Sequence, residues 1–130
     1  MSWIISRSNL SLFMSIIIGI GVDIEVISRF RDLLFNENKS FYGKIFTKRE
    51  IEYCNKYKDP YPHFAVRFCA KEAAVKALGK AVDLKKIEIQ RKSKSAWLRI
   101  DGRANLRAHV SLTHTKEHAI AFVILTKDKK

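Results

Sequence analysis

Cysteine and proline are scarce in this sequence, whose 130 residues include only two of each. Cys54 and Cys69 form no C-x-x-C pair and no closely spaced framework, which argues against a disulfide scaffold and predicts reduced thiols in a cytoplasmic protein. The sequence also lacks low-complexity tracts and Pro/Gly-rich linkers, and its length suits one domain rather than two.

A hydrophobic run long enough to cross a membrane is missing too. The most apolar stretch, residues 10–22, is too short for a span and lacks an Ala-x-Ala-like cleavage site. The ordered pattern begins just after Met14. We therefore expect one domain over residues 14–130, preceded by an N-terminal extension, residues 1–13, whose role the sequence does not indicate.

Acidic residues are few: the sequence has 13 Asp and Glu and 25 Lys and Arg, which gives a formal net charge of +12. The excess is spread over residues 39–130 and is not confined to a tail. Such a positive field attracts polyanions, so nucleic acid, an anionic membrane, a phosphorylated cofactor and an acidic protein all stay open as partners. A solubilising surface with no partner is the simplest alternative.

Residues 16–26 alternate with a period of two, which predicts a strand with one buried face. We expect the β-branched residues at the even positions to form that buried face. The opposite face carries Gly19, Gly21, Asp23 and Glu25. Glycines in a strand allow another group to approach the backbone closely, and tight packing or a bulge is the simplest interpretation.

The rest of the pattern predicts an α+β fold in which an antiparallel sheet packs against helices. One helix is expected over residues 28–35, and a capping box over residues 47–50 opens a second helix that ends near Tyr57. A third helix is expected over residues 63–78, with Gly79 as its C-terminal cap. Strands are expected over residues 87–89, 97–100, 110–113 and 119–126, the last of them central and buried.

The helix expected over residues 63–78 is apolar around almost its whole circumference. Two polar sectors interrupt it, one formed by Arg67 with Lys71 and the other by Glu72 with Lys76. Charges on such a helix must reach a cleft or have partners, because an unpaired buried charge is costly. Taken alone, Glu72 and Lys76 form a simple i,i+4 ion pair.

Asp23 supplies a second carboxylate from a separate element. Two carboxylates can hold Mg²⁺ when waters and the phosphates of a substrate complete its octahedral coordination. Neighbouring lysines and arginines suit the rest of such a polyphosphate. This combination points to a magnesium site that binds a phosphorylated substrate.

Three segments in register resemble holo-acyl-carrier-protein synthase, the small single-domain type of 4′-phosphopantetheinyl transferase: residues 19–29, residues 64–79, and residues 110–114 followed by the apolar residues 119–125. The resemblance covers residues 14–126. It implies the fold of that family and transfer of the 4′-phosphopantetheine group from coenzyme A to a serine of an acidic apo acyl carrier protein, with Mg²⁺ as cofactor and release of 3′,5′-ADP. It also implies a homotrimer with active sites at the subunit interfaces.

Carried over by position, the resemblance assigns roles to individual residues. Asp23 and Glu72 are expected to hold the Mg²⁺, and Arg29 to contact the carrier protein. The expected coenzyme contacts are Arg67, Lys71, Lys76, Gly79 and His114. The expected catalytic residues are Glu72, Lys76 and His114, while the base that accepts the serine proton stays open between Glu72, His114 and a metal-ordered water.

Two other functions compete with this hypothesis. A nucleic-acid-binding module without catalysis is the alternative from another class, but no recognised nucleic-acid motif accompanies its candidate residues, Arg91, Lys92, Lys94, Arg99, Arg103 and Arg107. Residues 114–118 match the H-x-x-E-H pattern of zinc proteases, which requires both histidines on one helix. We expect a turn between strands there, and neither nucleic acid nor a membrane as partner.

Overall fold

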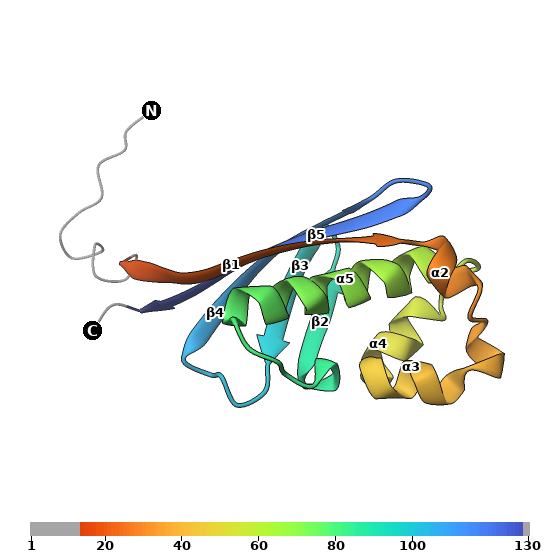
Figure 1. Cartoon of the computed structure of the whole chain (residues 1–130), viewed down its shortest axis with the longest axis horizontal. Coiled ribbons are helices and arrows are strands. Elements are labelled where there is room, and N and C mark those ends of the chain that lie inside the picture. Colours follow the sequence, from red (N-terminus) through yellow and green to blue (C-terminus); the bar gives the residue numbers. More distant parts are fainter. Residues whose placement is uncertain (1–13, 129–130) are drawn as a thin grey trace.

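The computed structural model describes residues 14–128, and the expected extension, residues 1–13, lies outside them. A five-stranded antiparallel sheet forms one layer, in the order β1-β5-β4-β3-β2. The long helix α5 (Tyr61–Leu78) runs across one face of this sheet (Figure 1). The predicted α+β class, with an antiparallel sheet against helices, is confirmed. None of the described helices is long and apolar enough to span a membrane.

The helix α5 is close to the expected one. It begins at Tyr61, slightly earlier than expected, because a proline is tolerated in the first turn, where the backbone N–H groups have no intrahelical partner. It ends at Leu78, and Gly79 follows in the left-handed conformation with φ 73°. The predicted glycine cap is therefore confirmed.

The strand β1 (Ser15–Val26) pairs with β5 (His118–Asp128), and a bulge interrupts the register between Ile17 and Gly19. Two glycines of β1 face α5. A Cβ atom built on Gly19 would lie 1.9 Å from the carbonyl oxygen of Ala77, and one built on Gly21 would lie 1.9 Å from that of Ala73. Only glycine permits this close approach of strand and helix, so tight packing is confirmed.

The expectation that the β-branched face of β1 is buried is wrong for this chain. Ile20 and Ile24 are 61% and 59% exposed, and Val22 between them is also exposed. In the neighbouring strand, Phe122 lies opposite Val22 and is 40% exposed. The alternation itself is confirmed, but the glycine side of β1 meets α5, because small residues allow the two backbones to approach each other.

Short helical segments connect β1 to α5. The expected helix over residues 28–35 is shorter than predicted, and α3 was not expected from the sequence. The capping box is confirmed, since Thr47 and Glu50 each accept a hydrogen bond from the other's backbone N–H. The segments are α2 (Ser28–Arg31), η1 (Phe35–Glu37), α3 (Lys39–Ile45) and α4 (Lys48–Cys54).

The expected C-terminal strands all form. β5 lies between β1 and β4, as predicted for an interior strand. Its inward side chains, such as Val123 and Leu125, are buried, but Phe122 on its other face is exposed, so only one face of β5 is covered. The remaining elements are η2 (Leu84–Lys86), β2 (Ile87–Lys92), β3 (Ser95–Ile100) and β4 (Leu106–His114).

Candidate active site

The close packing of β1 on α5 brings opposite charges together. Lys76 of α5 places its Nζ 3.1 Å from Oδ1 of Asp23 and also donates to the carbonyl oxygen of Val22 at 3.0 Å. From an earlier turn of α5, the thiol of Cys69 donates to the carbonyl oxygen of Asp23 at 3.0 Å. These contacts fix the position of Asp23 relative to the helix.

Asp23 lies in a cluster of carboxylates with Glu25 and Glu72. Its Oδ2 is buried and has no hydrogen-bond partner among the residues that the structure describes. Burial raises the pKa of Glu25 to about 7, Asp23 and Glu72 add to this rise, and Arg29 opposes it. Burial and the charge of Asp23 likewise raise the pKa of Glu72, and the charge of Lys76 partly offsets this rise. The cluster therefore concentrates negative charge where water shields it poorly.

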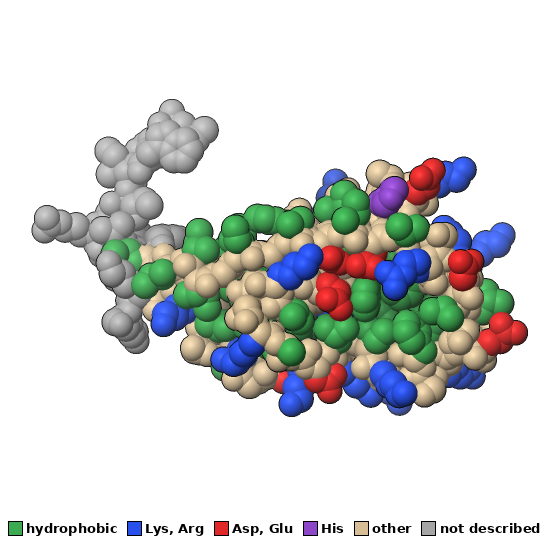
Figure 2. All heavy atoms as spheres, in the orientation of Figure 1, with side chains coloured by type: hydrophobic (Ala, Val, Ile, Leu, Met, Phe, Trp, Pro, Cys, Tyr) green, Lys and Arg blue, Asp and Glu red, His purple; other side chains and the backbone are tan. Residues whose placement is uncertain are grey.

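The cluster is open to solvent on one side. Figure 2 shows acidic side chains gathered over α5 and β1 in the middle of the visible face, with basic side chains on either side. A pocket of about 450 Å³ lies at this point, lined by Val22, Asp23, Ile24, Lys76 and Ile120. Because Val22 and Ile24 belong to the exposed apolar face of β1, the pocket lies at the edge of that face.

Asp23 and Glu72 fit a cation that takes its other ligands from water and substrate. Within residues 14–128, no group of three or more His, Cys, Asp and Glu side chains is arranged to hold a metal ion by itself. A positive charge beside Asp23 would satisfy its unpartnered oxygen and would relieve the repulsion that raises the pKa of Glu72.

Lys71 lies on another side of α5 and does not join this cluster. It is 0% exposed, its Nζ is 2.7 Å from Oε1 of Glu50, and it donates to the carbonyl oxygens of Leu84 and Ile87. The ammonium group therefore ties α5 to α4 and to the start of β2. The contact between Lys71 and coenzyme A that we expected from the sequence does not fit this buried position, because each of the three N–H donors of Lys71 already has a partner inside the core.

Arg67 belongs to a second basic site. Its side chain is almost completely buried, with the guanidinium carbon 4.1 Å from the ring centroid of Tyr53 and Nη1 donating to the carbonyl oxygen of His63. Its Nε is buried without a partner in the described part of the chain. Arg67 borders a pocket of about 260 Å³ that Arg49, Arg91 and Lys92 also line.

His114 lies close enough to His63, in the first turn of α5, for its charge to lower the pKa of His63. His114 is the last residue of β4 and is exposed. Burial and the charge of Arg67 lower the pKa of His63 most, and His114 lowers it further. The charges that act on the pKa of Glu72 are instead Asp23 and Lys76. Residues 114–118 join two strands and form no helix, so the zinc-protease pattern has no structural support.

Arg29 and Gly79 lie at the two ends of the site. Arg29 is the second residue of the short helix α2, and its Nη1 is 3.1 Å from Oε1 of Glu25. It lines a pocket of about 330 Å³ together with apolar side chains that include Phe41 and Phe68. Gly79 caps α5 one turn beyond Lys76, and no atom lies within 4 Å of the position that a Cβ would take there.

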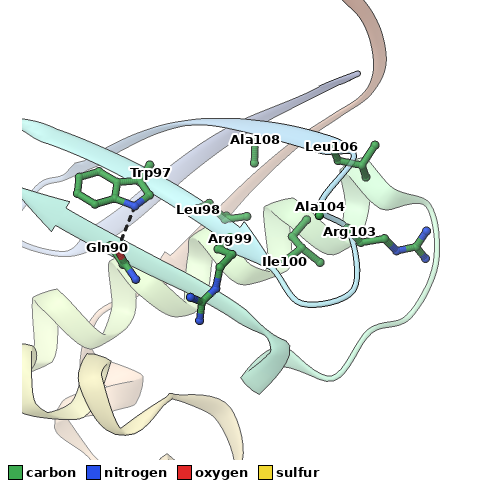
Figure 3. A pocket seen from close by; sticks show the side chains of 9 residues that line it. All are labelled: Gln90, Trp97, Leu98, Arg99, Ile100, Arg103, Ala104, Leu106 and Ala108. Atoms are coloured by element: carbon green, nitrogen blue, oxygen red, sulfur yellow. Dashed lines mark hydrogen bonds between the residues drawn. The ribbon is translucent and has the colours of Figure 1, made fainter. Parts of the chain in front are cut away.

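The basic residues considered for nucleic-acid binding do not form one free surface. Arg99 pairs with Glu88 and Asp101, and Arg107 pairs with Asp128. Figure 3 shows Arg99 and Arg103 at a separate pocket of about 530 Å³ between β3 and β4. There Trp97 donates from Nε1 to Oε1 of Gln90 at 3.0 Å.

Comparison with known proteins decides the family. The model of the 4′-phosphopantetheinyl transferase superfamily matches residues 19–123. The holo-[acyl-carrier-protein] synthase of Thermodesulfovibrio yellowstonii is 39% identical over 111 residues, which cover 83% of this chain and 97% of the relative. The chain belongs to the holo-[acyl-carrier-protein] synthase family. The synthase of Chlamydia caviae is 41% identical over 114 residues, which cover 81% of this chain and 93% of the relative.

Solved structures of holo-[acyl-carrier-protein] synthases have the same fold. A Bacillus anthracis synthase in complex with CoA (3′,5′-ADP) matches with a TM-score of 0.75 at 30% identity, covering 85% of this chain and 97% of that chain. A Helicobacter pylori synthase in complex with coenzyme A matches with a TM-score of 0.72 at 26% identity, covering 82% and 98%. The predicted family and enzyme class are confirmed, and the nucleic-acid-binding alternative is not favoured.

One member of the carboxylate cluster was not among the site residues predicted from the sequence. Glu25 received no role, although the period-two alternation places it on the same face of β1 as Asp23. That alternation was the available signal. The buried contacts of Lys71 had no comparable signal, because Glu50 lies on a different helix.

Proposed function

We propose that the chain transfers the 4′-phosphopantetheine group of coenzyme A to a serine of an acidic apo acyl carrier protein, releases 3′,5′-ADP and uses Mg²⁺. One observation carries this proposal: Asp23 has a buried, unpartnered oxygen beside Glu72 and Lys76 in a chain of this family. The proposed setting is fatty acid biosynthesis in the cytoplasm.

Asp23 and Glu72 are the proposed Mg²⁺ ligands. When bound there, Mg²⁺ would supply positive charge to the pyrophosphate of coenzyme A. The serine oxygen forms a bond to the β-phosphorus as the bond from that phosphorus to the 3′,5′-ADP oxygen breaks. The serine proton passes to Glu72, to His114 or to a water at the site.

Lys76 is the proposed electrostatic catalyst. Its ammonium group has three donors, and the contacts with Asp23 and Val22 leave one of them for a phosphate oxygen. The side chain is also largely exposed, so a substrate can reach it. A fixed cation at this point would stabilise the charge that develops on the leaving group.

The rest of the coenzyme would extend towards the pocket of Arg67. Arg49, Arg91 and Lys92 give this pocket the charge that a further phosphate requires, and the buried Nε of Arg67 lacks a partner. His114 would lie beside the phosphates from this side. Gly79 would leave room for the coenzyme next to Lys76, because it carries no side chain.

The proposed carrier contact is Arg29. Its exposed guanidinium lies between the carboxylate cluster and an apolar pocket, an arrangement that suits a partner with acidic and apolar side chains. The net charge of +12 would also attract an acidic carrier over longer distances.

A homotrimer with sites at the subunit interfaces is part of the proposal. Ile20, Val22, Ile24 and Phe122 leave an apolar face uncovered, and such faces usually mark interaction sites. A second copy of the chain on this face would also lie against the pocket beside Asp23, since Val22 and Ile24 line both.

Incubation of the chain with coenzyme A, Mg²⁺ and an apo carrier protein tests the proposal. Mass spectrometry should show phosphopantetheine added to the carrier, and Asp23→Asn or Glu72→Gln should lower the rate about 100-fold or more while circular dichroism stays unchanged. Glu117→Gln, in the exposed turn between β4 and β5, is the matched control and should keep the wild-type rate. Full activity of Asp23→Asn would disprove the assigned site.

A further inference from the structure

A partly buried carboxylate without a role in the proposed transfer lies next to the proposed carrier contact. The side chain of Glu25 is 12% exposed, and its Oε1 is 3.1 Å from Nη1 of Arg29. Arg29 is 71% exposed and stands on α2, directly after the strand that carries Glu25. The ion pair therefore joins a fixed anchor in β1 to a cation at the surface.

Among the described residues, Arg29 is the cation that pairs with Glu25. Lys76, the other cation of the cluster, is engaged with Asp23 and donates to the carbonyl oxygen of Val22. The contact with Glu25 therefore restrains Arg29 at the surface.

The chemistry of arginine allows Arg29 to serve two partners at once. Its guanidinium is a rigid fork with five donors, and the recorded contact to Glu25 uses Nη1. Its other donors have no partner among residues 14–128 and lie beside the apolar pocket that Phe41 and Phe68 also line. Arg29 can therefore bind an acidic partner without leaving Glu25.

We propose that Glu25 is a positioning residue, which holds Arg29 in the orientation that docks the carrier with its serine towards Asp23 and Glu72. This inference rests on the proposed function. An unrestrained arginine loses rotamer freedom when it binds a partner, and the contact with Glu25 imposes part of that loss beforehand. The effect should therefore be on carrier affinity and not on coenzyme affinity.

Steady-state kinetics of Glu25→Ala at pH 8 test this inference. We expect the KM for the carrier to rise about threefold to tenfold, while the KM for coenzyme A stays within about twofold of wild type. Asp128→Ala is the matched control, because it removes the acidic partner of another exposed arginine, Arg107, and should leave both KM values unchanged. Calorimetric titration with carrier alone, in the absence of coenzyme A, should show the same loss of affinity.

A double-mutant cycle separates positioning from general damage. If Glu25 acts through Arg29, the double variant of Glu25→Ala and Arg29→Ala should bind the carrier no more weakly than Arg29→Ala alone. Glu25→Gln, which keeps an acceptor but loses the charge, should give an intermediate KM and serves as the test if the alanine variant does not fold.

Equal rises in both KM values, an unchanged carrier KM, or additive effects of the two substitutions would each overturn the inference. A wild-type chain that modifies no apo carrier would refute the proposed function itself. A wild-type chain that transfers the group, together with a Glu25→Ala variant of normal carrier affinity, would refute only the role of Glu25.

Discussion

Glu25 and Glu72 hold their protons more tightly in the folded chain than in the unfolded one. Burial raises the pKa of Glu25 from its ordinary value of 4.5 to about 7. Between these values the folded state binds more protons than the unfolded state, so the contribution of Glu25 lowers the free energy of unfolding as pH rises through this interval. The proposed positioning of Arg29 thus has a cost in stability at neutral pH.

Replacing Glu25 by glutamine should remove that cost. In metal-free buffer at pH 8, Glu25→Gln should be more stable than wild type by about 1 kcal/mol, after allowance for solvent screening. At pH 4 the difference should largely disappear, because the carboxyl group is then mostly protonated in both states. Urea unfolding at the two pH values measures this difference, and a variant less stable than wild type at pH 8 would contradict it.

The relative positions of candidate site residues could be predicted where they depend on one strand and one helix alone. The alternation of β1 and the rotation of α5 led to the hypothesis that Asp23, Glu72 and Lys76 lie together, and the structure brings these three residues together. Their roles stay a prediction. Lys71 could not be placed in this way. Helix periodicity separates its sector from that of Glu72 but does not reveal that Glu50 of α4 is buried against it.

At the level of elements, the contact between β1 and α5 depends on glycine. A Cβ on Gly21 would lie 1.9 Å from a backbone carbonyl oxygen of α5, which a side-chain rotation cannot relieve. Gly21→Ala should therefore force the strand away from the helix, lower the stability by about 1–3 kcal/mol and reduce transfer activity, because Asp23 is on the same strand.

The chain contains a matched control for this substitution. Gly43 lies inside α3, and no atom is within 4 Å of the position that its Cβ would take. Gly43→Ala should be neutral or stabilising by up to about 1 kcal/mol. Thermal unfolding and activity of both variants check the prediction, and equal effects at the two glycines would show that close packing at β1 is not the cause.

The elements with strong local signals were predicted, and the others were not. The capping box of α4 and the glycine cap of α5 depend on neighbouring residues, so the sequence is sufficient for them. The helix α3 has no side-chain cap and contains a glycine, so it lacks a strong local signal. Its residues Tyr42 and Ile45 pack in or against the core, a contact between distant segments. The buried face of β1 was mistaken because hydrophobicity alone does not show which face meets the helix and which one is left uncovered.

At the scale of the whole molecule, the helices of the described residues lie on one face of the sheet and leave its other face without a helical layer (Figure 1). The other face combines β-branched residues of β1 with Phe122 of β5, and exposed residues of this kind at adjacent positions favour association. The pocket beside Asp23 opens at the edge of this face. Assembly through the sheet and activity at the carboxylate cluster should therefore depend on each other.

A charged residue in the uncovered face tests this dependence. Ile20 is exposed on this face and does not line the pocket beside Asp23, so Ile20→Glu should convert the proposed trimer to monomers without changing the site directly. Leu34→Glu, at an exposed position between α2 and η1, is the matched control and should stay trimeric. Analytical ultracentrifugation measures the assembly, and the transfer assay should show that monomeric Ile20→Glu loses activity about 10-fold or more, because an incomplete site positions the coenzyme poorly. A monomeric wild-type chain that transfers the group, or a monomeric Ile20→Glu variant with full activity, would show that the site is complete in one chain.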